Sequence, residues 1–96
     1  MIEIRLSAEP RDNTLITFDG HILELFSVLS KQSSRFHVFQ LASIEIVPDA
    51  RGKNTLSVKS KYANELLLGG HAIRDEVLAE AQALVTAVRE AMAAYP

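Results

Sequence analysis

Cysteine and tryptophan are both absent from the 96 residues of this chain. Without cysteine the protein forms neither disulfide bonds nor thiolate metal sites. Cysteine content therefore does not indicate whether the protein occupies an oxidising or a reducing compartment. No apolar run approaches the ~18 residues that a membrane-spanning helix requires. The first residues alternate charged and apolar side chains and lack the apolar stretch of a secretory signal peptide. We therefore expect a cytoplasmic protein.

A large excess of charge is also missing, because 10 basic and 12 acidic residues leave a formal net charge of −2. Nucleic-acid-binding domains usually carry a strong basic excess, so we expect no nucleic-acid partner. Only residues 31–61 carry a basic excess, with six basic side chains against two acidic ones. Once the chain is folded, these charges either form a basic rim or scatter over the surface.

The last quarter of the sequence has the pattern of an amphipathic helix. Its apolar side chains recur every three or four residues: Ile73, Val77, Ala81, Leu84, Val88, Met92 and Tyr95. Eight alanines in the same stretch favour helix formation. We predict one long helix over residues 71–95, and its apolar stripe needs a β-structure to pack against.

The residues before this helix predict short β-strands separated by polar turns. The expected strands cover residues 2–7, 14–18, 21–27, 35–40, 44–47, 55–59 and 64–68. We expect residues 29–34 to form a loop, residues 41–43 to form a bend, and Gly69–Gly70 to end the last strand. Residues 49–54 predict a hairpin loop in which Gly52 supplies the left-handed conformation.

The dipeptide Asp19–Gly20 lies between two β-rich runs and is typical of a two-residue type I′ hairpin. Such a turn would place Phe18 opposite His21 and Ile16 opposite Leu23. One face of the hairpin would then carry Ile16, Phe18, Leu23 and Leu25. The opposite face would carry Leu15, Thr17, Ile22, Glu24 and Phe26, and it is more apolar than a solvated sheet surface should be.

Seven short strands followed by one helix predict an α+β domain that is mainly β. Successive antiparallel neighbours are the simplest topology for strands joined by short turns. We therefore predict a seven-stranded bent antiparallel sheet, or a partly open barrel, capped by the long C-terminal helix. One domain then spans residues 1–96, with its strands within residues 2–69.

Three stretches of sequence also resemble a known family. They are residues 16–20 (Ile-Thr-Phe-Asp-Gly), residues 35–38 leading into residues 42–46, and residues 52–58 (Gly-Lys-Asn-Thr-Leu-Ser-Val). Together with the helix they cover most of residues 14–94, and they resemble small bacterial pleckstrin-homology-like (PH-like) domains of unknown function. The resemblance implies a PH-like fold and an interaction module, often oligomeric in bacteria, without an assigned reaction.

Signatures of catalysis are absent from the sequence. His21, His37 and His71 have neither the spacing nor the neighbouring carboxylates of a zinc site. No serine lies in a Gly-x-Ser-x-Gly motif, and Gly69–Gly70 lacks the spaced glycines of a phosphate-binding loop. We therefore expect a protein that is not an enzyme and that has no metal and no cofactor.

The apolar outer face of the first hairpin is the main candidate for a binding site. Leu15, Ile22 and Phe26 lie on this face, and Val47 is a further candidate beside it. Exposed apolar patches of this kind mark protein interfaces, so we predict protein–protein binding that includes self-association. The competing interpretation is that residues 28–34 or the curvature of the sheet cover this face.

The alternative function is binding of an anionic headgroup or another phosphate ligand. Its candidate residues are the basic side chains Lys31, Arg35, Arg51 and Lys53. They would have to converge on one rim of the folded domain, and the sequence does not decide whether they do. Membrane binding through anionic lipids belongs to this alternative and is not the main expectation.

Overall fold

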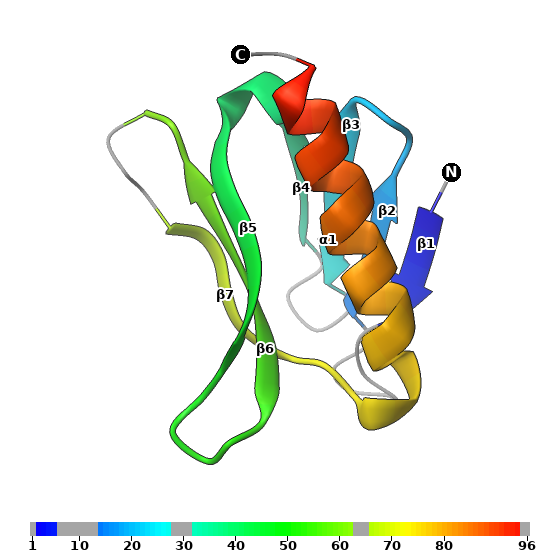
Figure 1. Ribbon diagram of the computed structural model, residues 1–96, viewed down its shortest axis with the longest axis vertical. Helices are drawn as coiled ribbons and strands as arrows, with labels where there is room; N and C mark the ends of the chain where they lie inside the picture. The colour runs from blue at the N-terminus through cyan, green and yellow to red at the C-terminus, as the bar shows by residue number, and fades with distance from the viewer. Residues whose placement is uncertain (1, 6–13, 28–31, 63–65, 95–96) are drawn as a thin grey trace.

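The computed structural model describes residues 2–5, 14–27, 32–62 and 66–94 (Figure 1). Its elements in chain order are β1 (Ile2–Arg5), β2 (Thr14–Phe18), β3 (Ile22–Ser27), β4 (Gln32–His37), the 3₁₀-helix η1 (Val38–Gln40), β5 (Leu41–Pro48), β6 (Asn54–Ser60), β7 (Leu66–Ala72), the 3₁₀-helix η2 (Asp75–Val77) and α1 (Leu78–Ala93). The prediction of a mainly β chain with one helix at its C-terminal end is confirmed for these residues.

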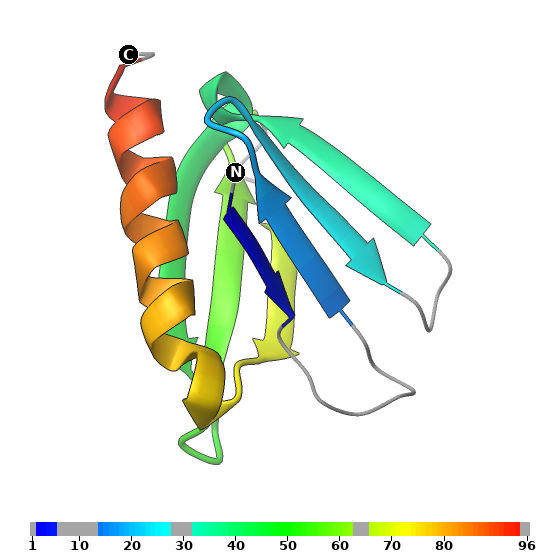
Figure 2. The same cartoon turned by 90° about the vertical axis from the view of Figure 1, so that its right-hand side faces the viewer.

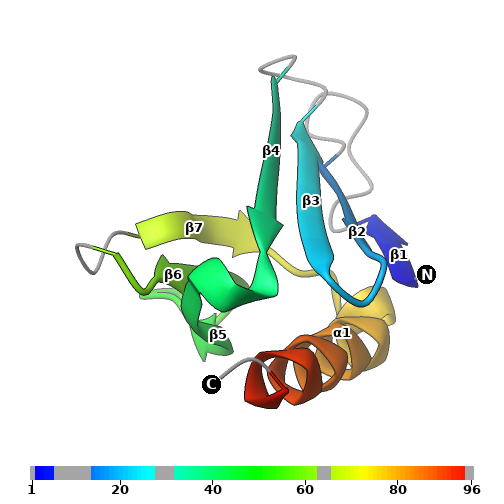
Figure 3. The ribbon, with the colours of Figure 1, turned by 90° about the horizontal axis from the view of Figure 1, so that it is seen from above.

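The described strands form two hydrogen-bonded sheets rather than one continuous bent sheet. Sheet A has the order β1-β2-β3-β4 and sheet B the order β5-β6-β7, and every neighbouring pair is antiparallel. The 3₁₀-helix η1 separates them along the chain. Seen from above, the two sheets and α1 form three sides around a common interior (Figure 3), and sheet A lies in front of sheet B in Figure 2.

Sheet A, sheet B and α1 all contribute side chains to the core. Alternation in the strands and the helical period in α1 place their apolar side chains on the faces that point inward. The buried residues of the core include Ile4, Ile16, Phe18 and Leu23 from sheet A, Leu41, Ile44, Leu56 and Val58 from sheet B, and Ala81, Leu84, Val85 and Val88 from α1. Each fully buried aliphatic side chain of this kind stabilises the fold by about 1.5–3 kcal/mol. The predicted inner face of the first hairpin is thus confirmed as part of the core.

The predicted helix over residues 71–95 is too long at its N-terminal end. His71 and Ala72 belong to β7, where they pair with Leu56 and Thr55 of β6. The chain then passes through η2, and regular α-helix begins only at Leu78. Strand pairing overrides the helix propensity of this stretch. The apolar stripe is nevertheless buried from Ile73 to Val88, and Tyr95 lies outside the described residues.

Gly69–Gly70 was expected to end the last strand, and this expectation is wrong. Strand β7 continues through both glycines to Ala72. Its pairing with β6 passes from Leu68 to His71 while β6 advances only from Val58 to Leu56, so β7 holds one extra residue there. An extra residue of this kind is a β-bulge, for which glycine is well suited. The glycines therefore bend this strand and do not terminate it.

The first hairpin has a longer loop than the predicted type I′ turn. Phe18 lies opposite Leu23 and Ile16 opposite Leu25, so the register differs from the prediction by two residues. The Asp19 carboxylate explains the difference, because it accepts hydrogen bonds from the backbone N–H groups of His21 (2.9 Å) and Ile22 (2.8 Å). A shift of two residues preserves which side chains share a face.

The segment after the first hairpin also differs from the prediction. Residues 32–34 belong to β4 instead of a loop, and residues 38–40 form η1 instead of a strand. A capping box starts η1, because the His37 backbone N–H donates to Gln40 Oε1 (2.8 Å) and the Phe39 N–H donates to His37 Nδ1 (3.3 Å). Residues 41–43 lie in β5, where a register shift replaces the expected bend.

Candidate functional site: the outer face of sheet A

The side of sheet A that points away from the core forms an ordered array of side chains. The strand register aligns them in rows that cross β1, β2, β3 and β4. We call this array the outer face; its residues are Glu3, Arg5, Leu15, Thr17, Ile22, Glu24, Phe26, Ser33, Arg35 and His37. In Figure 2 no described element lies in front of sheet A. The outer face is therefore open to a partner within the described part of the chain.

The first row joins Arg5, Leu15, Phe26 and Ser33. Leu15 and Phe26 face each other directly on β2 and β3, and such cross-strand pairs contact each other through their side chains. Leu15 is half-buried, whereas 37% of Phe26 is exposed. This pair is the apolar part of the outer face and lies in its end row.

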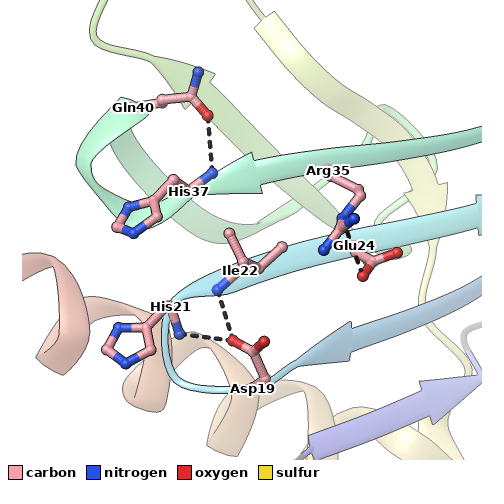
Figure 4. A network of polar contacts seen from close by, with 7 residues as sticks. All are labelled: Asp19, His21, Ile22, Glu24, Arg35, His37 and Gln40. Atoms are coloured by element: carbon pink, nitrogen blue, oxygen red, sulfur yellow. Dashed lines mark hydrogen bonds and ion pairs between the residues drawn. The ribbon is translucent and has the colours of Figure 1, made fainter.

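The second row joins Glu3, Thr17, Glu24 and Arg35, so it carries both signs of charge. Arg35 Nε lies 3.2 Å from Glu24 Oε1, and Figure 4 shows the two side chains turned toward each other on neighbouring strands. The Arg35 side chain is 67% exposed and the Glu24 side chain 24%. Water screens an ion pair of this exposure, which contributes at most about 1 kcal/mol to stability.

The third row contains Ile22 opposite His37, next to the loop of the first hairpin. The rings of His21 and His37 are stacked with centroids 6.2 Å apart, and the ring of Phe39 lies 4.5 Å from that of His37. Figure 4 shows both imidazoles at the same end of the sheet. The hydrogen bonds from the backbone N–H groups of Ile22 and His21 lower the pKa of the Asp19 carboxyl. The two hydrogen bonds that hold the loop therefore favour the ionised form of this carboxylate.

The four predicted interface residues do not form one patch. Leu15 and Phe26 are together, but the charged second row separates them from Ile22. Val47 lies on β5 of sheet B, where it is half-buried and its carbonyl accepts a hydrogen bond from Thr55 Oγ1 (2.8 Å). The apolar part of the candidate interface is therefore the Leu15–Phe26 pair.

The predicted anion-binding residues are also dispersed. Lys31 lies outside the described residues, and Arg35 pairs with Glu24. Arg51 and Lys53 share the β5–β6 loop, where their backbone N–H groups donate to Asp49 Oδ1 at 2.8 Å and 2.9 Å. Figures 1 and 2 place this loop at the opposite end of the domain from η1 and well away from β4.

A groove between β5 and α1 is a feature that the sequence did not reveal. It is lined by Ile46, Asn54, Leu78, Gln82, Val85, Thr86 and Arg89. At its edge Arg89 Nε donates to the carbonyl of Ile44 (3.1 Å), which ties the helix to the strand. These residues come from three separate elements, so no local pattern of spacing could have predicted their proximity.

The described residues contain no group of three or more His, Asp or Glu side chains placed to hold a metal ion. In the same part of the chain no helix is long and apolar enough to cross a bilayer. Comparison with protein-family models, curated proteins and solved structures gives no match for this chain. The geometry of the outer face therefore carries the functional argument.

Proposed function

We propose that the chain is a cytoplasmic, non-enzymatic interaction module with a PH-like fold. Its binding surface in this proposal is the outer face of sheet A, and its partners include a second copy of the chain. The observation that carries the proposal is the pair of half-buried Leu15 and exposed Phe26, which lies on a face that no described element covers. Removing such a pair from water lowers the free energy and therefore favours association with a partner.

The composition of the outer face supports the same proposal. An aromatic residue and a leucine lie in its first row, with charged and polar side chains beside them. Protein interfaces commonly combine aromatic and other apolar residues with polar and charged side chains. The ordered sheet also presents these side chains at fixed spacing, so binding costs little additional conformational entropy.

The test is the mass of the protein in solution, measured by sedimentation from low micromolar to millimolar concentration. The wild type should show a mass that rises with concentration, and Phe26→Lys should stay monomeric because a buried lysine ammonium opposes association. Tyr62→Lys is the matched control, since Tyr62 is 60% exposed outside sheet A. An oligomer unaffected by Phe26→Lys would contradict the proposed surface, and a monomer at every concentration would contradict self-association.

Binding of anionic headgroups is the alternative function, and it has weaker support. Glu24 partly neutralises Arg35, and only Arg51 and Lys53 share one exposed loop. Retention of the wild type on phosphatidylserine vesicles at low salt, lost in Arg51→Ala with Lys53→Ala, would favour this alternative. Low salt is the appropriate condition because screening of exposed charges is weakest there.

A further inference from the structure

We infer that two copies of this chain pack through their outer faces about a twofold axis that runs parallel to the strands, between β2 and β3. This inference rests on the proposed function and adds the arrangement of the two copies. The register of sheet A permits this arrangement, because a rotation about that axis keeps each row at its level and places β1 of one copy over β4 of the other and β2 over β3.

The charges of the second row fit this rotation. Glu3 of one copy comes to lie over Arg35 of the other, and the same contact forms a second time by symmetry. Both side chains are exposed on the single chain. Arg35 already pairs with Glu24 there, but its guanidinium has further N–H groups that can donate to a second carboxylate. In the middle of the row, Thr17 meets Glu24 of the other copy, which places a hydroxyl donor against a carboxylate.

The first row fits as well. Leu15 of one copy lies over Phe26 of the other, so the two apolar pairs cover each other. Sheets that pack face to face lie about 10 Å apart, a distance that apolar side chains of this size fill from both sides. The same rotation therefore brings apolar side chains against apolar ones and opposite charges against each other.

A twofold axis that runs across the strands is an alternative for two stacked sheets, and the charges oppose it. A rotation about such an axis through the second row would place Glu3 over Glu3 and Arg35 over Arg35 of the other copy. Like charges in direct opposition are unfavourable. Of these two axes, the charge pattern therefore favours the one parallel to the strands.

The size of the face limits the surface that the dimer can bury. Four strands at about 4.8 Å spacing and five residues at about 3.4 Å give a sheet area of roughly 320 Å² per copy. Stable interfaces usually bury about 800 Å² per partner. We therefore expect a weak, reversible dimer whose mass must be measured at high protein concentration.

The test mixes two variants whose charges are reversed separately. Glu3→Lys alone places lysine over Arg35, and Arg35→Glu alone places glutamate over Glu3, so each variant alone should be more monomeric than the wild type. In the mixed dimer every reversed residue meets its opposite charge, and both contacts are restored. The mass-average of the equimolar mixture should therefore exceed that of either variant alone at the same total concentration.

The matched control is a mixture of Glu45→Lys with Lys59→Glu. These substitutions make the same changes of net charge on exposed positions of sheet B, so each should behave as the wild type does, alone or mixed. A wild-type dimer that Phe26→Lys dissociates, but whose charge variants show no recovery on mixing, would overturn this arrangement and leave the proposed surface intact. A wild-type monomer at every concentration would overturn both. Circular dichroism of each variant verifies that it is folded.

Discussion

Replacement of Leu84 by alanine tests whether α1 is an essential wall of the core. The Leu84 side chain has no exposed surface and belongs to the common core, to which both sheets contribute. Removing such a leucine loses its transfer free energy and leaves a cavity, which together destabilise a protein by about 2.7–5 kcal/mol. Domains of this size have a free energy of unfolding of only about 5–15 kcal/mol. Leu84→Ala should therefore remove a large part of the total stability.

The assay is thermal unfolding followed by circular dichroism at one fixed protein concentration, because self-association also raises the apparent stability. Each kcal/mol lowers the melting temperature of a domain of this length by about 4–8 °C, so a decrease of at least ~10 °C is expected. Gln82→Ala is the control, since Gln82 is exposed two residues earlier on the same helix. A loss below about 1 kcal/mol for Leu84→Ala would refute the packing described here.

Two further predictions concern the hairpin loops. The folded-state pKa of Asp19 lies below the unfolded value, so its stabilising contribution is present above the unfolded pKa of 3.8 and is lost as pH falls through the folded pKa. Chemical denaturation as a function of pH should show this loss of stability in the wild type. In Asp19→Asn the acid-dependent loss of the free energy of unfolding should be smaller. Identical pH profiles of the two proteins would contradict the role of the carboxylate. At Gly52, φ is +79° and no atom would obstruct a β-carbon. Gly52→Ala should therefore cost about 1–2 kcal/mol from backbone conformation alone, and Gly52→Asn should cost less; equal stability of the alanine variant would contradict this explanation.

Local periodicity predicted which side chains are buried better than it predicted where elements end. Ile16, Phe18 and Leu23 are core residues as the alternation indicated, although the hairpin register was wrong. The predicted division of side chains between the two faces is still correct, because the Asp19 loop moves the register by two residues. Side chains in a strand alternate with a period of two, so such a shift keeps each side chain on its face. A shift by one residue would have exposed the whole inner set.

Contacts between distant segments explain the parts that the sequence did not predict. Gly69–Gly70 has the composition of a strand end, but pairing with β6 carries the strand through it. Val47 and Phe26 have similar local patterns, and only the division into two sheets shows that they do not share a face. The pairing of β3 with β4 adds Arg35 and Ser33 to the outer face, and the amino-acid sequence contains no turn signal that determines this register.

The mass of the wild type and of Phe26→Lys, measured side by side by sedimentation up to millimolar concentration, tests the central claim most directly. The outer face of sheet A as a self-association surface predicts a wild-type mass that rises toward that of a dimer, while Phe26→Lys stays at the monomer mass. If both proteins sediment as monomers, or if both form the same dimer, the outer face is not the surface through which this chain associates.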